Sequence, residues 1–412
     1  MFFGDRMLFI NRLIWFFVLV SLLFLGIYFS IFLKGIQFRF RDMFRSVFSG
    51  SSFGILMTSL AGRIGVGSIA GVCLSIYVGG VGSIFWMWVS TFFCCVITYC
   101  EVVLGIKYKS HYGGPAYYIR DGLGNRFLGG LYSVLIIVCY IGCFLCIQSN
   151  TITRSLISLF SFSPYVIGLC ISVVTFFCIY GGFKSIVGVC NKVVPFMCLV
   201  YIGSSILVLF FHYDMIFSVF LNVIKSAFDL RSFTGGFIPM VIVGLQRGVF
   251  SNEAGIGTSS IVASVGSDFR VQGFVQMFGV YFTSFIICSA TAIIVLFCDY
   301  SGFDLGSING IELAGYAFRY HFGNIGSYIL VISVVLFSFS TIITGYYYGE
   351  CGLNYFSVDK LFVYVLRFVT LVILFFGCVL PSSLIWGFVD IIVGILIIVN
   401  LYAIFKLRNK IE

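Results

Sequence analysis

Charged residues are scarce in this 412-residue chain. Lysine, arginine, aspartate and glutamate together make up 9% of the sequence, and 60% of the residues are hydrophobic. Soluble globular domains carry about 25% charged residues, so this chain has too few to cover a soluble surface. The apolar residues form long blocks, unlike the short alternating segments of a membrane β-barrel. We therefore expect an all-α polytopic membrane protein in a lipid bilayer.

Signals for catalysis are also missing. The 3 histidines, His111, His212 and His321, are predicted to lie in loops, away from any serine or cysteine in a triad-like pattern. There is no Walker A pattern, so direct use of ATP is not expected. The 15 cysteines lie mostly inside apolar runs, without the histidine spacing of a metal site. The sequence therefore predicts neither an enzyme nor an organic cofactor.

The net charge of +9 is better explained by topology than by a nucleic-acid partner. Lysines and arginines concentrate in cytoplasmic loops of membrane proteins. Loop 34–52 carries Lys34, Arg39, Arg41 and Arg45, and most other basic loop residues fall on the same side when this loop is cytoplasmic. We expect the N-terminus outside and the C-terminus in the cytoplasm.

Apolar blocks long enough to cross a bilayer recur along the chain. Since a helix needs about 20 apolar residues to cross the hydrocarbon core, they predict about eleven spans. These spans cover 12–34, 53–78, 82–106, 129–154, 164–181, 185–211, 236–265, 272–298, 324–348, 361–380 and 383–406. The first block continues into a basic loop, which favours a retained span over a cleaved signal peptide.

The spans after the first divide into two sets of five. They cover residues 53–211 and 236–406, between an N-terminal segment of 1–52 and a cytoplasmic tail of 407–412. Because five is odd, the second set must enter the membrane from the opposite side, as in an inverted repeat. The sequence thus predicts a 5+5 inverted repeat with one extra N-terminal span.

The first span of each set contains a polar, glycine-rich interruption. In the first set it runs over 61–71, and in the second over 245–258. A glycine inside a helix costs about 1 kcal/mol relative to alanine, and a charge at bilayer depth costs roughly 3 kcal/mol. Interruptions in corresponding spans indicate two broken helices that line a shared site near mid-membrane.

Broken helices expose backbone groups that can hold charged ligands. Free N–H groups near Val66 suit a carboxylate, and free carbonyls near Phe250 suit an ammonium group or Na⁺. A zwitterion such as an amino acid needs both ends close together. The predicted substrate-binding residues are Gly65, Val66, Gly67, Ser68, Phe250, Ser251, Asn252, Gly255 and Gly257.

Hydroxyl groups on a later span predict a cation site. Ser340 and Thr341, with the carbonyls of Ala61 and Ile64, would give Na⁺ a shell of oxygens. The alternative is that both hydroxyls only bond back to their own helix, as serine and threonine often do in membrane helices.

Charged residues at the breaks need partners at this depth. We expect Arg63, Arg247 and Glu253 to neutralise one another and lock the break. The carboxylate of Glu253 is alternatively available to a coupling ion. Glu101 and Asp390, in other spans, are expected to form local pairs.

The motifs at these positions resemble those of the alanine or glycine:cation symporter family, within the amino acid–polyamine–organocation group. The matching segments are Gly65–Val72, Ile84–Ser90, Glu101–Val103, Gly113–Ile119, Arg247–Gly257 and Phe339–Ile343. The resemblance implies the leucine-transporter fold and Na⁺-coupled uptake of a small neutral amino acid, such as alanine or glycine, across a bacterial inner membrane. It also implies that Gln148 contacts the substrate.

The chain departs from the family pattern at the first break. The family usually has Gly-Thr-Gly-Asn where this chain has Gly65-Val66-Gly67-Ser68, which removes one hydroxyl and one amide. Gly345 stands where relatives often have tryptophan or asparagine, and an enlarged pocket for a larger amino acid is one alternative.

Proton coupling is a second alternative. A channel lined by the same carbonyls and a membrane enzyme are the competing classes, although we find no interfacial cluster of His, Asp or Glu for the enzyme. The sequence makes no prediction about the oligomeric state.

Overall fold

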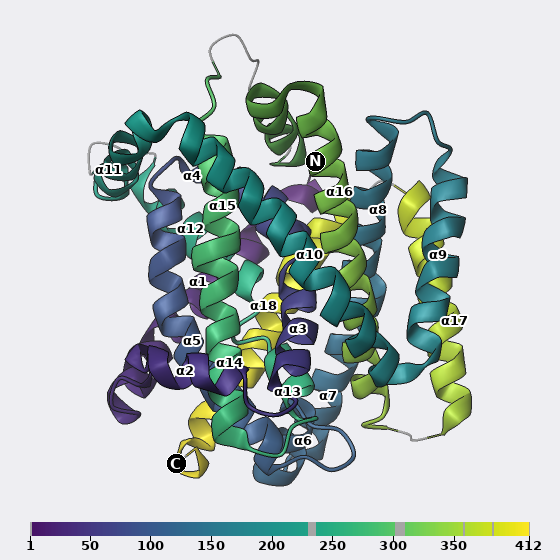
Figure 1. The fold of residues 1–412 in the computed structure, drawn as a ribbon. Coiled ribbons are helices and arrows are strands. Elements are labelled where there is room, and N and C mark those ends of the chain that lie inside the picture. Colours follow the sequence, from purple (N-terminus) through teal and green to yellow (C-terminus); the bar gives the residue numbers. More distant parts are fainter. Residues whose placement is uncertain (1, 230–235, 301–309, 357–358, 381–382, 412) are drawn as a thin grey trace.

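The computed structural model describes residues 2–229, 236–300, 310–356, 359–380 and 383–411, and within these ranges it contains helices and no strands. The predicted all-α class is confirmed for this part of the chain. The helices form an upright bundle whose two termini lie toward opposite ends (Figure 1).

The N-terminal segment contributes one long helix and two short ones. They are α1 (Phe2–Phe32), the 3₁₀ turn η1 (Ile36–Phe38) and α2 (Phe40–Val47). α1 packs against α18 (Ser383–Lys406) and α5 (Ser83–Lys107), whereas α2 packs against α14 (Phe269–Tyr281). The extra helix is therefore part of the bundle.

The first predicted repeat begins with a broken helix, as the glycine-rich segment indicated. Its elements are α3 (Ser52–Arg63), the π-helix η2 (Gly67–Gly71), α4 (Val72–Gly79), α5, α6 (Pro115–Gly122), α7 (Arg126–Ile137), the π-helix η3 (Val138–Phe144), α8 (Leu145–Ile157), α9 (Pro164–Tyr180) and α10 (Gly182–Phe211). α3 and the following η2–α4 helix are bent by 58°.

The second predicted repeat also begins with a broken helix, after a short connection. This connection holds η4 (Tyr213–Met215) and α11 (Ile216–Ala227). The repeat comprises α12 (Phe237–Asn252), α13 (Thr258–Ala263), α14, the π-helix η6 (Phe282–Cys288), α15 (Ser289–Leu296), α16 (Gly310–Leu353), α17 (Lys360–Val379) and α18, with η7 (Arg408–Lys410) behind it.

Length and composition show which elements can cross a membrane. Eight of the described helices are long and apolar enough, and the bent pair that starts at Ser52 is a ninth. The predicted span at 164–181 corresponds to α9, which has 17 residues, and the one at 236–265 to the broken pair α12 and α13. All the predicted spans are therefore helical, although breaks shorten some of them.

The helix that contains His321 is longer than the sequence suggested. α16 begins at Gly310, and its non-helical kink lies at Gly323, with φ 59° and ψ −143°. The prediction that His321 lies in a loop is therefore wrong. The residues before the kink carry too many polar side chains to be recognised by apolar block length.

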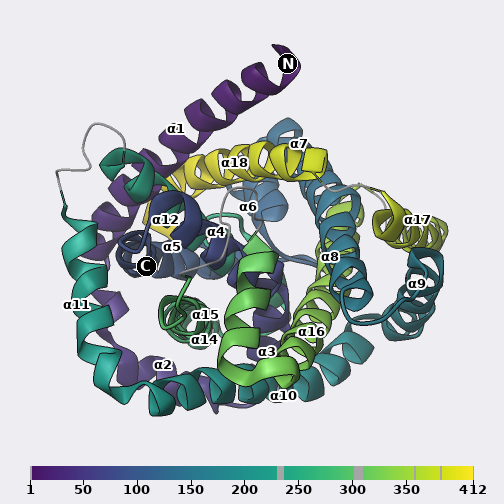
Figure 2. The same ribbon diagram turned by 90° about the horizontal axis from the view of Figure 1, so that it is seen from above.

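The core lies where the two broken helices meet their neighbours. α5 packs against α12, α13 and α14, and α16 packs against α3, α8 and α10. α9 and α17 lie side by side at one edge of the bundle, where α17 also contacts α8 (Figure 2). The broken helices are thus enclosed by other helices.

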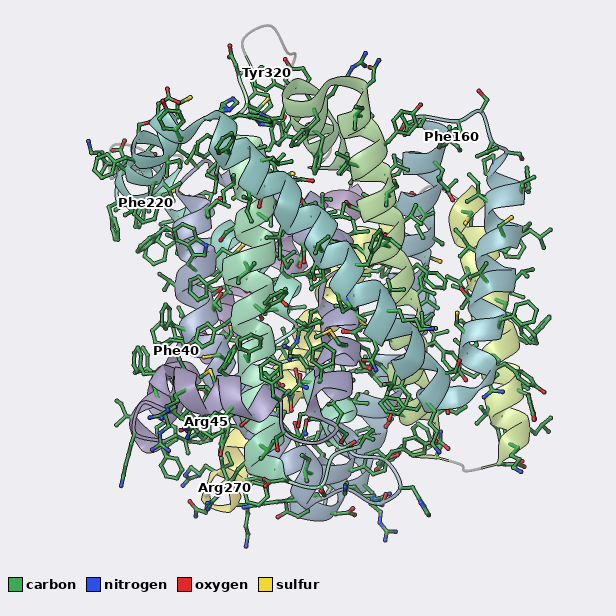
Figure 3. All side chains as sticks on the ribbon, viewed as in Figure 1. Phe40, Arg45, Phe160, Phe220, Arg270 and Tyr320 are labelled. Carbon is green, nitrogen blue, oxygen red and sulfur yellow. The ribbon has the colours of Figure 1, made fainter. Side chains whose placement is uncertain are left out.

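Side chains divide the surface into an apolar belt and a basic end. Large apolar residues such as Phe127, Phe177 and Phe210 are more than two-thirds exposed. Basic side chains, including Arg45 and Arg270, gather at the end of the bundle that holds the C-terminus (Figure 3). A lipid-facing belt above a cationic end is typical of a multi-pass membrane protein.

Candidate substrate and cation site

The first break begins where α3 ends at Arg63. Ile64 leaves the helical region, with φ −85° and ψ 74°, and the helix resumes at η2. A Cβ atom at Gly65 would lie 2.7 Å from Thr341 Oγ1 and 3.2 Å from Gln148 Nε2. A glycine is therefore needed here because two polar side chains approach the backbone.

The N–H group at the start of the resumed helix is aimed at Gln148. Val66 N lies 3.5 Å from Gln148 Oε1, at the long end of hydrogen-bond distances. Gln148 lies on α8 and is buried. The structure thus brings together the predicted carboxylate-binding backbone and the glutamine that the resemblance implied.

The second break has a longer linker with unusual backbone geometry. α12 ends at Asn252, and Glu253, Gly255 and Gly257 follow with φ of 54°, 86° and 100°. A left-handed conformation is uncommon for a residue other than glycine. Asn252 Oδ1 accepts a hydrogen bond from Ala254 N at 3.0 Å, which satisfies one of the backbone groups freed by the break.

The two breaks contact each other directly. Ser251 Oγ donates to the carbonyl of Gly67 at 3.3 Å. A Cβ atom at Gly67 would lie 3.2 Å from the ring of Phe250. The carbonyl of Ser68 accepts a hydrogen bond from Thr291 of α15 at 2.8 Å. The interruptions that the sequence pairs by their place in the repeats are therefore neighbours in space.

Three of the four predicted Na⁺ ligands lie together. Ser340 Oγ and Thr341 Oγ1 both donate to the carbonyl of Ala61, at 3.3 and 3.0 Å, and both also contact the carbonyl of Phe337 at 2.9 Å. All these residues are buried. Ile64 follows at the break, and among the described contacts none joins it to either hydroxyl.

The chemistry of this cluster suits a monovalent cation. Its ligands are neutral carbonyl and hydroxyl oxygens, which hard cations prefer. Within the described residues there is no group of three or more histidine, cysteine, aspartate or glutamate side chains placed for a metal ion. The cluster could therefore hold Na⁺ with neutral oxygen ligands alone.

An aromatic stack beside the breaks was not anticipated. Phe250 stacks on Phe144 at 5.5 Å, Phe144 stacks on Tyr140 at 4.8 Å, and Tyr140 meets Tyr348 edge-on at 4.9 Å between ring centroids. Tyr140 and Phe144 precede Gln148 at intervals of four residues. That spacing places them on one helix face, and it is the signal that could have identified them.

Glu253 is held by hydroxyl groups. Tyr140 donates to Oε1 at 2.7 Å and Thr258 to Oε2 at 2.8 Å. Both carboxylate oxygens therefore have partners within the second break and its neighbour η3. This geometry pins the left-handed residue in place.

The expected mutual neutralisation of the charged residues is wrong for Arg247. One of its terminal nitrogens lies 3.8 Å from Asp390 Oδ2 on α18, and its guanidinium lies 5.7 Å from the Phe250 ring centroid. From α1, Asn11 Nδ2 lies 3.4 Å from the same oxygen, and Trp15 donates to the Asp390 carbonyl at 3.2 Å. The partner could not be anticipated because it comes from the last helix.

Arg63 also takes partners other than those expected. It donates to Gln276 O at 3.1 Å, to Gln276 Oε1 at 3.0 Å and to Ser259 Oγ at 2.7 Å. These neutral acceptors lie on α14 and α13. They engage both terminal nitrogens, whereas Nε has no hydrogen-bond partner among the described residues. Within the same residues, Arg63 forms no direct ion pair with Glu253.

Glu101 and Asp390 both have polar partners, and these come from helices distant in the sequence. Asp390 pairs with Arg247 of α12. Glu101 Oε1 accepts a hydrogen bond from Asn400 of α18 at 2.7 Å, and Asn400 also donates to Gly255 O at 2.8 Å. α18 thus contributes Asn400 to the linker of the second break and Asp390 to the helix before it.

Gly345 faces the aromatic stack. A Cβ atom at this position would lie 3.1 Å from Leu145 and 3.4 Å from Tyr140. The space that a larger residue would fill is therefore taken by neighbouring side chains.

Comparison with known proteins decides the family. The profile of the sodium:alanine symporter family matches residues 3–412. The chain belongs to this family.

Two relatives and one solved structure show the extent of the similarity. A probable sodium/glutamine symporter of Bacillus subtilis (strain 168) is 34% identical, over 97% of this chain and 87% of its own length. The sodium/alanine symporter of Methanococcus maripaludis is 31% identical, over 87% of this chain and 82% of its own length. The structure of a Na⁺-coupled sialic acid symporter in a substrate-bound, outward-open state matches with a TM-score of 0.61 and 13% sequence identity. The match covers 97% of this chain and 86% of that one.

These matches confirm several predictions. The resemblance drawn from the motifs is correct, and the structural match confirms the leucine-transporter-like fold. Members of the sodium:alanine symporter family are membrane transporters and not enzymes, and their coupling ion is Na⁺. The chain is therefore a multi-pass membrane protein of a sodium–amino acid symporter family.

Proposed function

We propose that this protein imports a small neutral amino acid with Na⁺, by alternating access around its two broken helices. The observation that carries the proposal is the contact between the breaks, where Ser251 and Phe250 meet Gly67. This contact places the N–H groups of one half-helix next to the end of the other. A zwitterion needs that arrangement, because its two charges require groups of opposite polarity.

The carboxylate of the substrate would bind at Gly65, Val66, Gly67 and Ser68. In this arrangement the carboxylate would replace Gln148 Oε1 as the acceptor of the Val66 N–H group. The amide nitrogen of Gln148 would remain available as a second donor. Phe250 would cover the substrate from the second break. Ser251, Asn252, Gly255 and Gly257 would shape the site through the backbone that they hold.

A small side chain fits this site best. Leu145 and Tyr140 occupy the space next to Gly345, so the glycine frees no room for a larger ligand. We therefore favour alanine or glycine over the larger substrate that the enlarged-pocket alternative requires.

Sodium would bind between Ala61, Ser340 and Thr341, with Ile64 as a further backbone ligand. α3 and α16 both contribute to this cluster. A cation there would tie the first break to α16, next to Gly65. Occupation of the cation site would thus favour the backbone shape that the carboxylate needs, which couples the two ligands.

The ion pair of Arg247 and Asp390 would close the site on the outer side. It lies next to Phe250 and joins α12 to α18. Opening toward the outside would require this pair to separate. The basic end of the bundle would face the cytoplasm of a bacterial cell, with the C-terminus inside and the N-terminus outside the inner membrane.

Uptake into proteoliposomes tests the proposal. Labelled alanine, glycine, serine and glutamine are each supplied with an inward Na⁺ gradient, with equal Na⁺ on both sides, and with a pH gradient in Na⁺-free buffer. We expect alanine or glycine to accumulate only with the Na⁺ gradient. Accumulation driven by the pH gradient alone would replace Na⁺ with H⁺, and no uptake under any gradient would contradict the proposal.

A further inference from the structure

A groove on the basic end of the bundle combines cationic and apolar walls. It has a volume of about 540 Å³ and lies between α6, α7 and the end of α16. Its walls are formed by Arg120, Arg126, Phe127, Gly130, Leu131, Val134, Tyr355 and Phe356. None of these residues belongs to the proposed substrate or cation site.

The charged part of the groove is built by two arginines. Arg120 forms a bidentate ion pair with its neighbour Asp121, at 2.7 and 2.9 Å, and its guanidinium lies 5.2 and 5.5 Å from the rings of Tyr117 and Tyr355. Arg126 is exposed, and its side chain forms no ion pair with any described residue. Asp121 lies near enough to interact electrostatically with both arginines. Two arginines against one aspartate leave the groove entrance with a net positive charge.

The apolar part of the groove follows α7 toward the membrane centre. Phe127, Leu131 and Val134 point outward and are 81%, 38% and 47% exposed, while Tyr132 and Ser133 face the core. Val134 is eight residues beyond Arg126, or about 12 Å along a helix. The groove thus runs from a charged interface to apolar depth along one helix face.

Only an amphiphile matches both parts. A soluble anion would leave the apolar wall uncovered, and an uncharged acyl chain would leave the net positive charge of the entrance unmatched. Basic pockets at the cytoplasmic ends of membrane helices bind anionic lipid headgroups. We propose that this groove binds one anionic phospholipid, with its phosphate at Arg126 and Arg120 and an acyl chain along Phe127, Leu131 and Val134.

The groove joins the two helices that carry the candidate binding residues. Tyr355 donates to the carbonyl of Arg126 at 2.8 Å, and a Cβ atom at Gly130 would lie 3.4 Å from the Phe356 ring. α7 continues through η3 into α8, which carries Gln148. Tyr355 lies two residues beyond the end of α16, which carries Ser340 and Thr341. A bound lipid would therefore hold the inner ends of these two helices together.

Native mass spectrometry of the full chain in detergent tests the proposal without measuring transport. Dioleoyl phosphatidylglycerol is titrated against dioleoyl phosphatidylcholine. We expect one phosphatidylglycerol to be retained in preference. Since a basic residue near an anionic headgroup is worth about fivefold in affinity, Arg126→Gln should weaken binding about fivefold, and the double variant with Arg120→Gln by about 25-fold.

Two further variants separate this site from general surface charge. Gly130→Trp fills the apolar part and keeps both arginines, so it should also weaken binding. Arg45→Gln with Arg270→Gln removes two exposed arginines from the same end of the bundle (Figure 3), and it should leave the affinity unchanged.

The outcomes that overturn the proposal are distinct. Equal retention of phosphatidylcholine would show that charge plays no part, and an equal loss in the Arg45 and Arg270 control would show a diffuse basic surface. Displacement of the lipid by soluble glycerol phosphate would show a free-anion site. A dimer that forms through the groove and excludes lipid would show that a second copy of the chain occupies it.

Discussion

The two broken helices differ in how each break is held open. At the first break, between α3 and η2, the glycine backbone is approached by side chains from other helices, namely Gln148 and Thr341. At the second break, between α12 and α13, hydrogen bonds fix the linker directly. Some come from other helices, since Tyr140 bonds to Glu253 and Asn400 to the carbonyl of Gly255, and others come from the segment itself. Asn252 bonds to Ala254 within the linker, and Glu253 bonds to Thr258 on the helix that follows.

From this difference we expect the two breaks to have different roles, one in ligand affinity and one in forming the site. The first break has polar partners that a ligand could displace, so its residues should control affinity. The second break has a fixed shape, three positive φ angles and an ion pair to α18, so its residues should control whether the site forms at all. Substitutions can test these two roles directly.

The largest effect is expected for Gly257→Ala. Gly257 has φ +100°, and a Cβ atom there would lie 2.2 Å from Pro115 Cγ. Backbone strain alone costs roughly 1–3 kcal/mol, and the clash adds to it, so the amount of folded protein on size-exclusion chromatography should fall severely. Gly182→Ala is the matched control, because Gly182 also has positive φ but open space around it. Equal losses in both variants would contradict the role of the close contact.

A smaller but still large effect is expected for Arg247→Gln. Breaking a buried ion pair costs about 3–5 kcal/mol, and the exposed part of this pair reduces that figure, so we expect a lower melting temperature and reduced uptake. Asp390→Asn should act in the same way. The double variant should recover part of the stability, because no unpaired charge remains. If the melting temperature of the double variant falls by the sum of the two single decreases, the two residues do not interact.

At the first break, the double variant Ser340→Ala with Thr341→Ala should change affinity and not folding. Losing two oxygen ligands should raise the Na⁺ concentration for half-maximal uptake at least tenfold, since about 1.4 kcal/mol corresponds to a factor of ten. Ser338→Ala is the control on the same helix, because Ser338 Oγ is buried without a hydrogen-bond partner. An unchanged Na⁺ dependence with normal folding would assign both hydroxyls to helix packing alone.

The smallest effect is expected for Gln148→Ala. The contact with Val66 N is long, and a typical hydrogen bond contributes about 1 kcal/mol. The KM for the amino acid should therefore rise about fivefold, while the yield of folded protein and the Na⁺ dependence stay unchanged. If the folded yield falls instead, Gln148 belongs with the residues that shape the site.

The sequence predicted the elements whose signals are local. The glycine-rich interruptions mark both breaks, and their matching place in the two halves predicts that Gly67 and Phe250 meet. The clustering of Ala61 with Ser340 and Thr341 was predicted from their chemistry, since carbonyls freed by a break and two hydroxyls together form an oxygen shell.

The partners of the charged residues could not be predicted in this way. Asp390 and Gln276 reach Arg247 and Arg63 only through the packing of distant helices. The π-helical segments η2, η3 and η6 were also missed, because a shift in backbone hydrogen bonding leaves no periodic pattern in the side chains. Such segments are frequent at functional sites, and η3 carries Tyr140 and Phe144.

The contact of α1 with Asp390 has a consequence for the order of assembly in the cell. α1 leaves the ribosome long before α18, yet Asn11 and Trp15 of α1 contact Asp390, the α18 residue that pairs with Arg247. Folding proceeds from the N-terminal side during synthesis. The earlier helices therefore enter the membrane before Asp390, the partner of Arg247, has been synthesised. The ion pair between Arg247 and Asp390 can therefore form only after α18 has been synthesised.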